Sequence, residues 1–199
     1  MEVVTFVTSP SNHPRKPYNQ KMTDEALMQQ VKADDLEGAS ALYDRYSKRL
    51  YNYFVKISFD RESSSDLLQN TFLRMIKYRH TYREDRPFQA WIFQIARNVF
   101  ADELKSKKVQ TSDFVDVYNL EKSWNEGEAA EIENKERNLH LALAKLDAES
   151  REILVLSRFQ EMKYQQIAEI MDLTVSAVKV KVHRAIKKLR EYYLEIERI

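Results

Sequence analysis

The sequence predicts an all-α protein made of two small helical domains joined by an acidic linker. Only two glycines and four prolines occur in 199 residues, and three of the prolines lie within the first 17. Few helix breakers, together with abundant Leu, Ala, Glu, Lys and Gln, favour helix over most of the chain. Apolar residues recur at helical spacing in two separate blocks, which predicts two modest hydrophobic cores.

The first block, 23–108, is predicted to be a four-helix bundle, preceded by a flexible tail at 1–22. The tail has neither the basic start nor the apolar centre of a secretory signal. Thr23, followed by two acidic residues, is expected to begin the first helix, which runs to about Ala33. A second helix is expected from about 35 to 59.

The third and fourth helices complete this first domain. Ser63, with Asp66 three residues later, forms a predicted capping box for a helix that ends near Tyr78. Pro87 suits the first turn of the fourth helix. The expected core face of that helix is Phe88, Trp91, Ile92, Ile95, Ala96 and Val99.

Composition changes after Lys108, where we expect a linker at 109–136. Between Thr111 and Glu136 there are eight acidic residues and two lysines, a net charge of −6. Helical periodicity returns from about Arg137, so the second domain is expected to span 137–199.

The second domain contains a predicted helix-turn-helix at Tyr164–Arg190. Asp172 suits the left-handed residue that ends the first helix, and Thr174 suits the N-cap of the second. The predicted buried face of the second helix is Val178, Val182, Ala185, Ile186 and Leu189, and the other face is cationic: Lys179, Lys181, His183, Arg184, Lys187, Lys188 and Arg190. Such a helix suits the major groove of DNA. The plainer alternative is a helical hairpin whose charged face is solvated.

A second candidate nucleic-acid surface surrounds the loop at 78–87. Aromatic residues interleaved with arginines suit single-stranded nucleic acid, because bases stack on rings while guanidinium groups hold phosphates. A solvated rim is the alternative interpretation. The candidate residues are Tyr82, Arg83 and Arg86 in the loop, with Arg97 and Asn98 on the fourth helix.

Several classes of function are excluded or disfavoured. The chain has no cysteine, which excludes disulfides, thiolate zinc sites and cysteine nucleophiles. Its four histidines form no pair at metal-ligand spacing, and no glycine-rich phosphate loop or nucleophile motif occurs. We therefore expect no metal, no cofactor and no catalysis. No apolar run approaches a membrane span, so we expect a cytoplasmic protein without direct membrane insertion.

Both domains resemble those of bacterial RNA polymerase sigma factors. LYDRYSKRLYNYF, DLLQNTFLRMIKYR and RPFQAWIFQIARNVFADELKSKK resemble sigma domain two in order and spacing, and LALAKLDAESREILVLSRFQEMKYQQIAEIMDLTVSAVKVKVHRAIKKLRE resembles sigma domain four. Two such blocks without domains one or three resemble the extracytoplasmic-function (ECF) group. The resemblance implies a promoter-specificity subunit whose partners are core RNA polymerase, through its largest-subunit clamp helices and β flap, promoter DNA and an anti-sigma factor.

The resemblance also implies a role for individual residues. The positions that match the polymerase-docking surface are Asp66, Gln69, Asn70 and Leu73, of which Asn70 stands where the family often has Glu. Tyr82 falls where an aromatic commonly lies beside a flipped base of the −10 element, and Asn98 where a polar residue reads that base. The residues implied in binding the −35 element are Thr174, Ser176, Lys179, Val180, Lys181, His183, Arg184 and Lys187. Among these, Lys181 and Lys187 are expected on phosphates and Arg184 on a guanine.

Three alternatives remain at this stage. A helix-turn-helix regulator that acts without polymerase would bind duplex DNA but would not need the 23–108 block. A structural adaptor built of helical bundles would bind no DNA at all. Within the sigma-factor interpretation, a closed state in which the two domains cover each other's binding surfaces is also possible.

Overall fold

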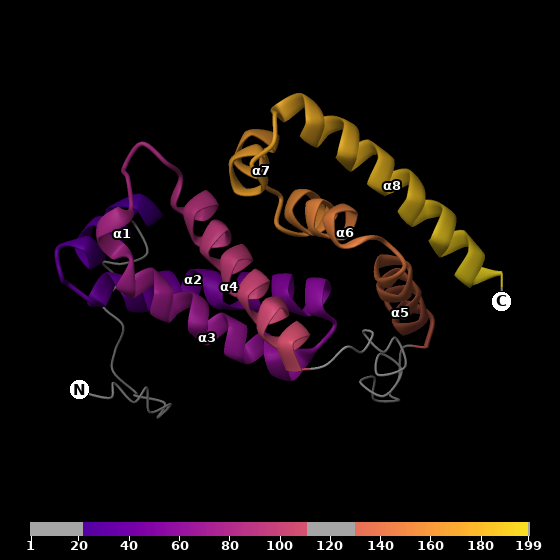
Figure 1. Ribbon diagram of the computed structural model, residues 1–199, viewed down its shortest axis with the longest axis horizontal. Coiled ribbons are helices and arrows are strands. Elements are labelled where there is room, and N and C mark those ends of the chain that lie inside the picture. The colour runs from indigo at the N-terminus through magenta and orange to yellow at the C-terminus, as the bar shows by residue number, and fades with distance from the viewer. Residues whose placement is uncertain (1–21, 111–129, 199) are drawn as a thin grey trace.

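The computed structural model describes residues 22–110 and 130–198, and every regular element in these ranges is helical (Figure 1). The predicted all-α class is therefore confirmed. For 107–110 and 130–133 only the backbone is described. The expected tail at 1–22, except its last residue, and most of the expected linker lie outside the described residues.

Four helices form the first bundle, drawn from indigo to magenta in Figure 1. They are α1 (Asp24–Lys32), α2 (Glu37–Ser58), α3 (Arg61–Lys77) and α4 (Phe88–Gln110), with a short 3₁₀ turn, η2 (Arg79–Thr81), between the last two. The buried side of α2 includes Leu42, Leu50 and Phe54, none of which is exposed. This face joins the apolar sides of the three neighbouring helices into one core.

Local capping explains where these helices begin, and it corrects one prediction. Thr23 caps α1, since its hydroxyl accepts the backbone N–H of Ala26 at 3.2 Å. The predicted capping box at Ser63 is wrong, because Asp60 caps α3 and accepts the N–H of Ser63 at 3.0 Å. The carboxylate of Asp60, three residues before the predicted cap, competes better for these free N–H groups, and the helix begins at Arg61.

The second group of helices is α5 (Ala130–Ala144), α6 (Ala148–Leu154), α7 (Tyr164–Met171) and α8 (Val175–Glu197). A π-helical turn, η4 (Val155–Phe159), continues α6. Helix α5 begins seven residues before the predicted domain boundary at 137, so the end of the expected linker is helical. The stretch was assigned to the linker because it is acidic. It is nevertheless rich in Ala and Glu, both of which have high helix propensity.

The two groups pack together in a single body (Figure 1). Helix α4 lies against α7, and α2 lies against α6 and η4. Buried apolar side chains such as Phe93 of α4 and Val155 of η4 belong to one continuous cluster. Trp91 is only 7% exposed within this cluster, as its place on the predicted core face implies.

Gly38 lets α1 and α2 approach closely, which generates a stability prediction. A Cβ at this position would lie 2.5 Å from the carbonyl oxygen of Leu27, a backbone atom that cannot move aside alone. Alanine gains about 1 kcal/mol of helix propensity over glycine, whereas forced overpacking costs about 1–3 kcal/mol. We therefore expect Gly38→Ala to lower the melting temperature, by about 2–4 °C for each kcal/mol lost.

The control for this prediction is Ser40→Ala, an exposed position one half-turn further along α2. It receives the propensity gain without the close contact, so its melting temperature should equal or exceed that of the parent. Thermal unfolding followed by circular dichroism measures both. A Gly38→Ala protein as stable as Ser40→Ala would contradict the account.

Candidate nucleic-acid interface

The turn between α7 and α8 has the predicted helix-turn-helix geometry. Asp172 ends α7 in the left-handed conformation, at φ 54° and ψ 51°. The hydroxyl of Thr174 then accepts the N–H of Ala177 at 3.1 Å and caps α8. Val178, Val182 and Ala185 are buried, and they fix the rotation of α8 about its axis. The opposite face of the helix is therefore presented outward.

This outward face holds most of the residues predicted to meet duplex DNA. Val180 is 48% exposed, and its side chain is an apolar spot between cations. Ile186, predicted to be buried, is 36% exposed, because the contact with α6 covers a narrower stripe of α8 than the sequence pattern suggested. The predicted residues that are exposed are Thr174, Ser176, Lys179, Val180, His183, Arg184 and Lys187.

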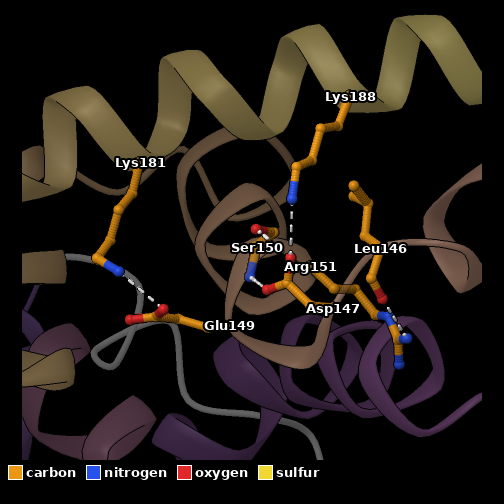
Figure 2. A network of polar contacts seen from close by, with 7 residues as sticks. All are labelled: Leu146, Asp147, Glu149, Ser150, Arg151, Lys181 and Lys188. Carbon is orange, nitrogen blue, oxygen red and sulfur yellow. Dashed lines mark hydrogen bonds and ion pairs between the residues drawn. The ribbon is translucent and has the colours of Figure 1, made fainter.

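Lys181 differs from the other predicted DNA residues because it points toward α6. Its ammonium group lies 2.7 Å from Glu149, as Figure 2 shows. Lys188, two turns later, lies 3.5 Å from Asp147 of the same helix start. In this conformation both lysines attach α8 to α6, so the expected phosphate contact of Lys181 would require that its ion pair be released or shared.

Asp147 is the centre of the network in Figure 2. The N–H of Ser150 donates to its carboxylate at 2.8 Å, which caps α6, and this hydrogen bond is the main reason that the pKa of Asp147 lies below its usual value. The nearby Lys188 acts in the same direction. Arg151, one residue further, donates to the carbonyl of Leu146 at 2.9 Å. The pair between Asp147 and Lys188 links the start of α6 to α8.

A separate hollow of about 330 Å³ opens on α3. It brings together all four residues predicted to bind polymerase, among them Leu73, which is 50% exposed. Glu103 of α4 also lines it, and sequence reasoning missed this residue because only the packing of α3 on α4 places it there. The lining residues are Ser63, Asp66, Leu67, Gln69, Asn70, Leu73 and Glu103.

Tyr82 lies in the core and not on the surface expected for it. It is 1% exposed, and its hydroxyl donates to the carbonyl of Arg86 at 2.9 Å. Its ring centre lies 5.1 Å from that of Trp91 and 6.2 Å from that of Phe88. Burial is the main cause that raises its pKa to about 12. Tyr82 thus anchors the loop to the core, and in this conformation its ring is not available to a base.

The polar candidates around this loop are held in different ways. Arg83 pairs with Asp85 at 2.7 Å within the loop, where both side chains are largely exposed. Arg86 lies 3.7 Å from Glu169 of α7. Asn98 of α4 is exposed. Tyr82 is therefore buried, and three of the other four predicted −10 residues, Arg83, Arg86 and Arg97, each pair with an acidic side chain of this protein.

Arg97 is engaged by a residue of the other helix group. Its guanidinium group lies 3.2 Å from the carboxylate of Glu152 on α6, and the same carboxylate accepts the hydroxyl of Tyr53 of α2 at 2.9 Å. Tyr53 is fully buried, and its pKa is raised well above the usual value, mainly by burial. No sequence pattern pointed to Glu152, which lies 55 residues from Arg97 along the chain.

Among residues 22–110 and 130–198, no group of three or more His, Asp or Glu side chains is placed to hold a metal ion. Within the same ranges, no helix is long and apolar enough to cross a bilayer.

Comparison with protein families identifies both halves of the chain. Residues 42–109 match the family description sigma-70 region 2, and residues 136–189 match sigma-70, region 4. The two matches cover the α2–α4 block with its hollow and the α6–α8 block with the helix-turn-helix.

Similar proteins agree with these matches. The chain is 28% identical over 168 residues to the ECF RNA polymerase sigma factor BldN of Streptomyces coelicolor, a match that spans 82% of this chain and 63% of that protein. It is 29% identical over 154 residues to the ECF RNA polymerase sigma factor SigM of Bacillus subtilis, which spans 76% of this chain and 93% of that protein.

A solved structure has the same fold. The sigma factor RpoE of Bartonella quintana, in complex with the anti-sigma factor NepR, superposes with a TM-score of 0.62 at 20% identity, over 77% of this chain and 94% of that one. The order of the two sigma-70 regions, the ECF relatives and the shared helical fold agree: this chain belongs to the ECF group of RNA polymerase sigma factors and acts in transcription initiation.

Proposed function

We propose that this sigma factor brings core RNA polymerase to promoters by three separate surfaces: the α3 hollow for polymerase, α4 with the 78–87 loop for the −10 element, and α8 for the −35 element. The observation that carries the proposal is the α3 hollow. A regulator that binds DNA without polymerase has no use for such a surface, whereas a sigma factor must dock on the enzyme. Such a subunit works by reversible binding, without catalysis.

The composition of the hollow suits a helical partner such as the clamp helices of the largest subunit. Leu73 offers an exposed apolar contact, and Gln69 and Asn70 beside it can donate and accept hydrogen bonds. Asp66 and Glu103 add negative charge at the rim, which favours a partner surface with basic residues. Most of the binding energy of such interfaces comes from a few central side chains, and Leu73 is the candidate here.

The exposed face of α8 suits the major groove of the −35 element. The guanidinium group of Arg184 can donate two hydrogen bonds to a guanine, and Val180 can meet a thymine methyl. Lys179 and Lys187 supply sequence-independent attraction to phosphates. Lys181 joins them only if its pair with Glu149 is released.

For the −10 element, Asn98 is the candidate base-reading residue. Its amide both donates and accepts, as recognition of adenine requires, and it is exposed on α4. Tyr82 supports the loop from the core, so its contribution is to hold the loop in shape. Arg83 is the loop arginine with the most exposed side chain, at 72%.

Two further partners follow from family membership. An anti-sigma factor is a candidate, since the structurally similar RpoE was solved with the anti-sigma factor NepR. The β flap of polymerase is the expected contact of the second domain, and action at promoters implies a place at the nucleoid. The acidic stretch at Thr111–Glu136, whose first 19 residues lie outside the described ranges, is proposed to follow the cationic channels of the polymerase.

The test of the proposed function mixes the purified protein with bacterial core polymerase and a fragmented genomic library, and sequences the run-off transcripts. Discrete start sites preceded by two shared elements are expected, and they give the promoter sequence directly. Stable DNA binding without any affinity for core polymerase would instead indicate a regulator that acts without polymerase.

Leu73→Gln is expected to weaken binding to core polymerase about tenfold, because it removes the apolar centre of the hollow while glutamine keeps the helix propensity. Fluorescence anisotropy of labelled sigma factor titrated with core polymerase measures the dissociation constant. Leu36→Gln is the matched control, an exposed leucine at the N-cap of α2 and outside the hollow, which should bind as the parent does. Equal loss in the two variants would remove Leu73 from the docking surface.

Arg184→Ala is expected to reduce transcription from the identified promoter about tenfold, since one bidentate contact with a base contributes about 1–3 kcal/mol of discrimination. Binding to core polymerase should not change. Arg198→Ala, beyond the cationic face at the C-cap of α8, is the control for loss of positive charge. If both variants transcribe equally, Arg184 does not read the −35 element.

Asn98→Ala is expected to reduce promoter opening more than initial duplex binding, because the flipped base loses its hydrogen-bonding partner. Permanganate reactivity of thymines in the melted region measures opening. Asn52→Ala, at an exposed position of α2, carries the same substitution outside the proposed surface. Unchanged permanganate reactivity in Asn98→Ala would exclude the base-reading role.

A further inference from the structure

Glu152 lies where the two helix groups meet, and its carboxylate is shared between them. Its side chain is only 16% exposed. Its carboxylate accepts a hydrogen bond from the hydroxyl of fully buried Tyr53 of α2 at 2.9 Å. It also forms an ion pair with the guanidinium group of Arg97 of α4 at 3.2 Å. A largely buried carboxylate requires such partners, since burial without them is costly. All of these partners come from the first helix group.

A second polar contact holds the same interface closed. Arg49 of α2 donates to the backbone carbonyl of Gln160 at 2.8 Å, and the amide of Gln160 donates back to the carbonyl of Arg49 at 3.2 Å. Gln160 is 3% exposed. Nearby, the ammonium group of Lys56 lies 4.9 Å from the ring centre of Phe159. Both polar contacts lie among the apolar side chains that join the two groups, and each can be replaced by contacts with water when the groups separate.

Closure affects the three proposed surfaces unequally. The α3 hollow and the outward face of α8 are both exposed in this conformation. By contrast, α7 packs on α4, and Arg86 and Arg97 face the carboxylates of Glu169 and Glu152. The closed protein can therefore present its polymerase surface and its −35 surface while part of its −10 surface is occupied.

We propose that Glu152 is an internal substitute for a DNA phosphate: in the free protein its carboxylate occupies Arg97 and keeps the two domains closed over α4, and DNA must displace it before the −10 surface is complete. The proposal rests on the −10 role of Arg97 in the proposed function. It adds a regulatory contact within the chain, which acts before any partner protein binds.

The carboxylate can be changed without removing bulk. Glu152→Gln keeps an oxygen that accepts the Tyr53 hydroxyl but cannot form an ion pair with Arg97. Tyr53→Phe keeps the ring in its packing against Phe93, at 5.4 Å between ring centres, and removes only the hydroxyl. Glu195→Gln is the matched control, because it removes one negative charge from an ion pair with Lys145 inside the second group.

The test measures energy transfer between two dyes in the free protein. The chain has no cysteine, so single cysteines introduced at exposed Glu62 of α3 and Glu197 of α8 take the dyes selectively. Glu152→Gln and Tyr53→Phe should each lower the transfer efficiency. The ratio of open to closed molecules should rise about two- to fivefold, which corresponds to the free energy that a partly exposed ion pair contributes. Glu195→Gln should match the parent, and circular dichroism should show that all variants keep their helices.

DNA supplies the second readout. An oligothymidine strand added to the parent should lower the transfer efficiency, and Glu152→Gln should need about two- to fivefold less of it, because no internal carboxylate competes. Unchanged efficiency in Glu152→Gln, or bound DNA (detected by anisotropy) that leaves the parent closed, would each overturn the proposal. Neither readout uses polymerase, so failure of the sigma-factor assay with core enzyme would be recognised separately.

Discussion

The guanidinium group of Arg151 holds the contact on which the arrangement of the two helix groups depends. It donates to three carbonyls at the end of α5, those of Leu143, Ala144 and Leu146, and to the carbonyl of Ile57 near the end of α2, all at 2.9–3.2 Å. The last turns of both helices have unpaired carbonyls and partial negative charge, which a cation stabilises. Burial lowers the pKa of Arg151, but it remains charged, because arginine does not deprotonate in proteins. One side chain thereby joins the α5–α6 turn to the first bundle.

The π-helical turn η4 adds a polar contact between the two helix groups. The N–H of Gln160 donates to the carbonyl of Val155 at 3.0 Å, a spacing wider than that of an α-helix, and Glu161 then takes a left-handed conformation at φ 53°. The turn ends the helix where it meets α2, and it leaves Gln160 against Arg49. Single π-turns within helices often occur at functional positions. Here the turn places a polar residue at an interface that is otherwise apolar.

The sequence predicted those parts of the structure that depend on local chemistry. Asp172 and Thr174 identified the turn between α7 and α8, because a left-handed residue and an N-cap are set by neighbouring backbone groups. The four α3 residues named for polymerase docking came from the family resemblance, and all four line the same hollow. Burial of Tyr82 could not be predicted from its aromatic-cationic surroundings, since it depends on where Trp91 and Phe88 pack. The pairing of Glu152 with Arg97 joins residues 55 positions apart, and no periodicity encodes such a contact.

Acidic residues of α6 and of its N-cap form ion pairs with both helices that are proposed to bind DNA. Asp147 and Glu149 at its start pair with Lys188 and Lys181 of α8, whereas Glu152, one turn later, pairs with Arg97 of α4. A helix of seven residues thus directs carboxylates to both neighbours, because its start and its opposite side face different helices. Against α8 the pairs are at least one-third exposed and contribute little to stability, since water screens them. Against α4 the carboxylate is largely buried and hydrogen-bonded twice, so its charge acts at greater strength. The same acidic helix therefore holds α8 loosely and α4 more tightly.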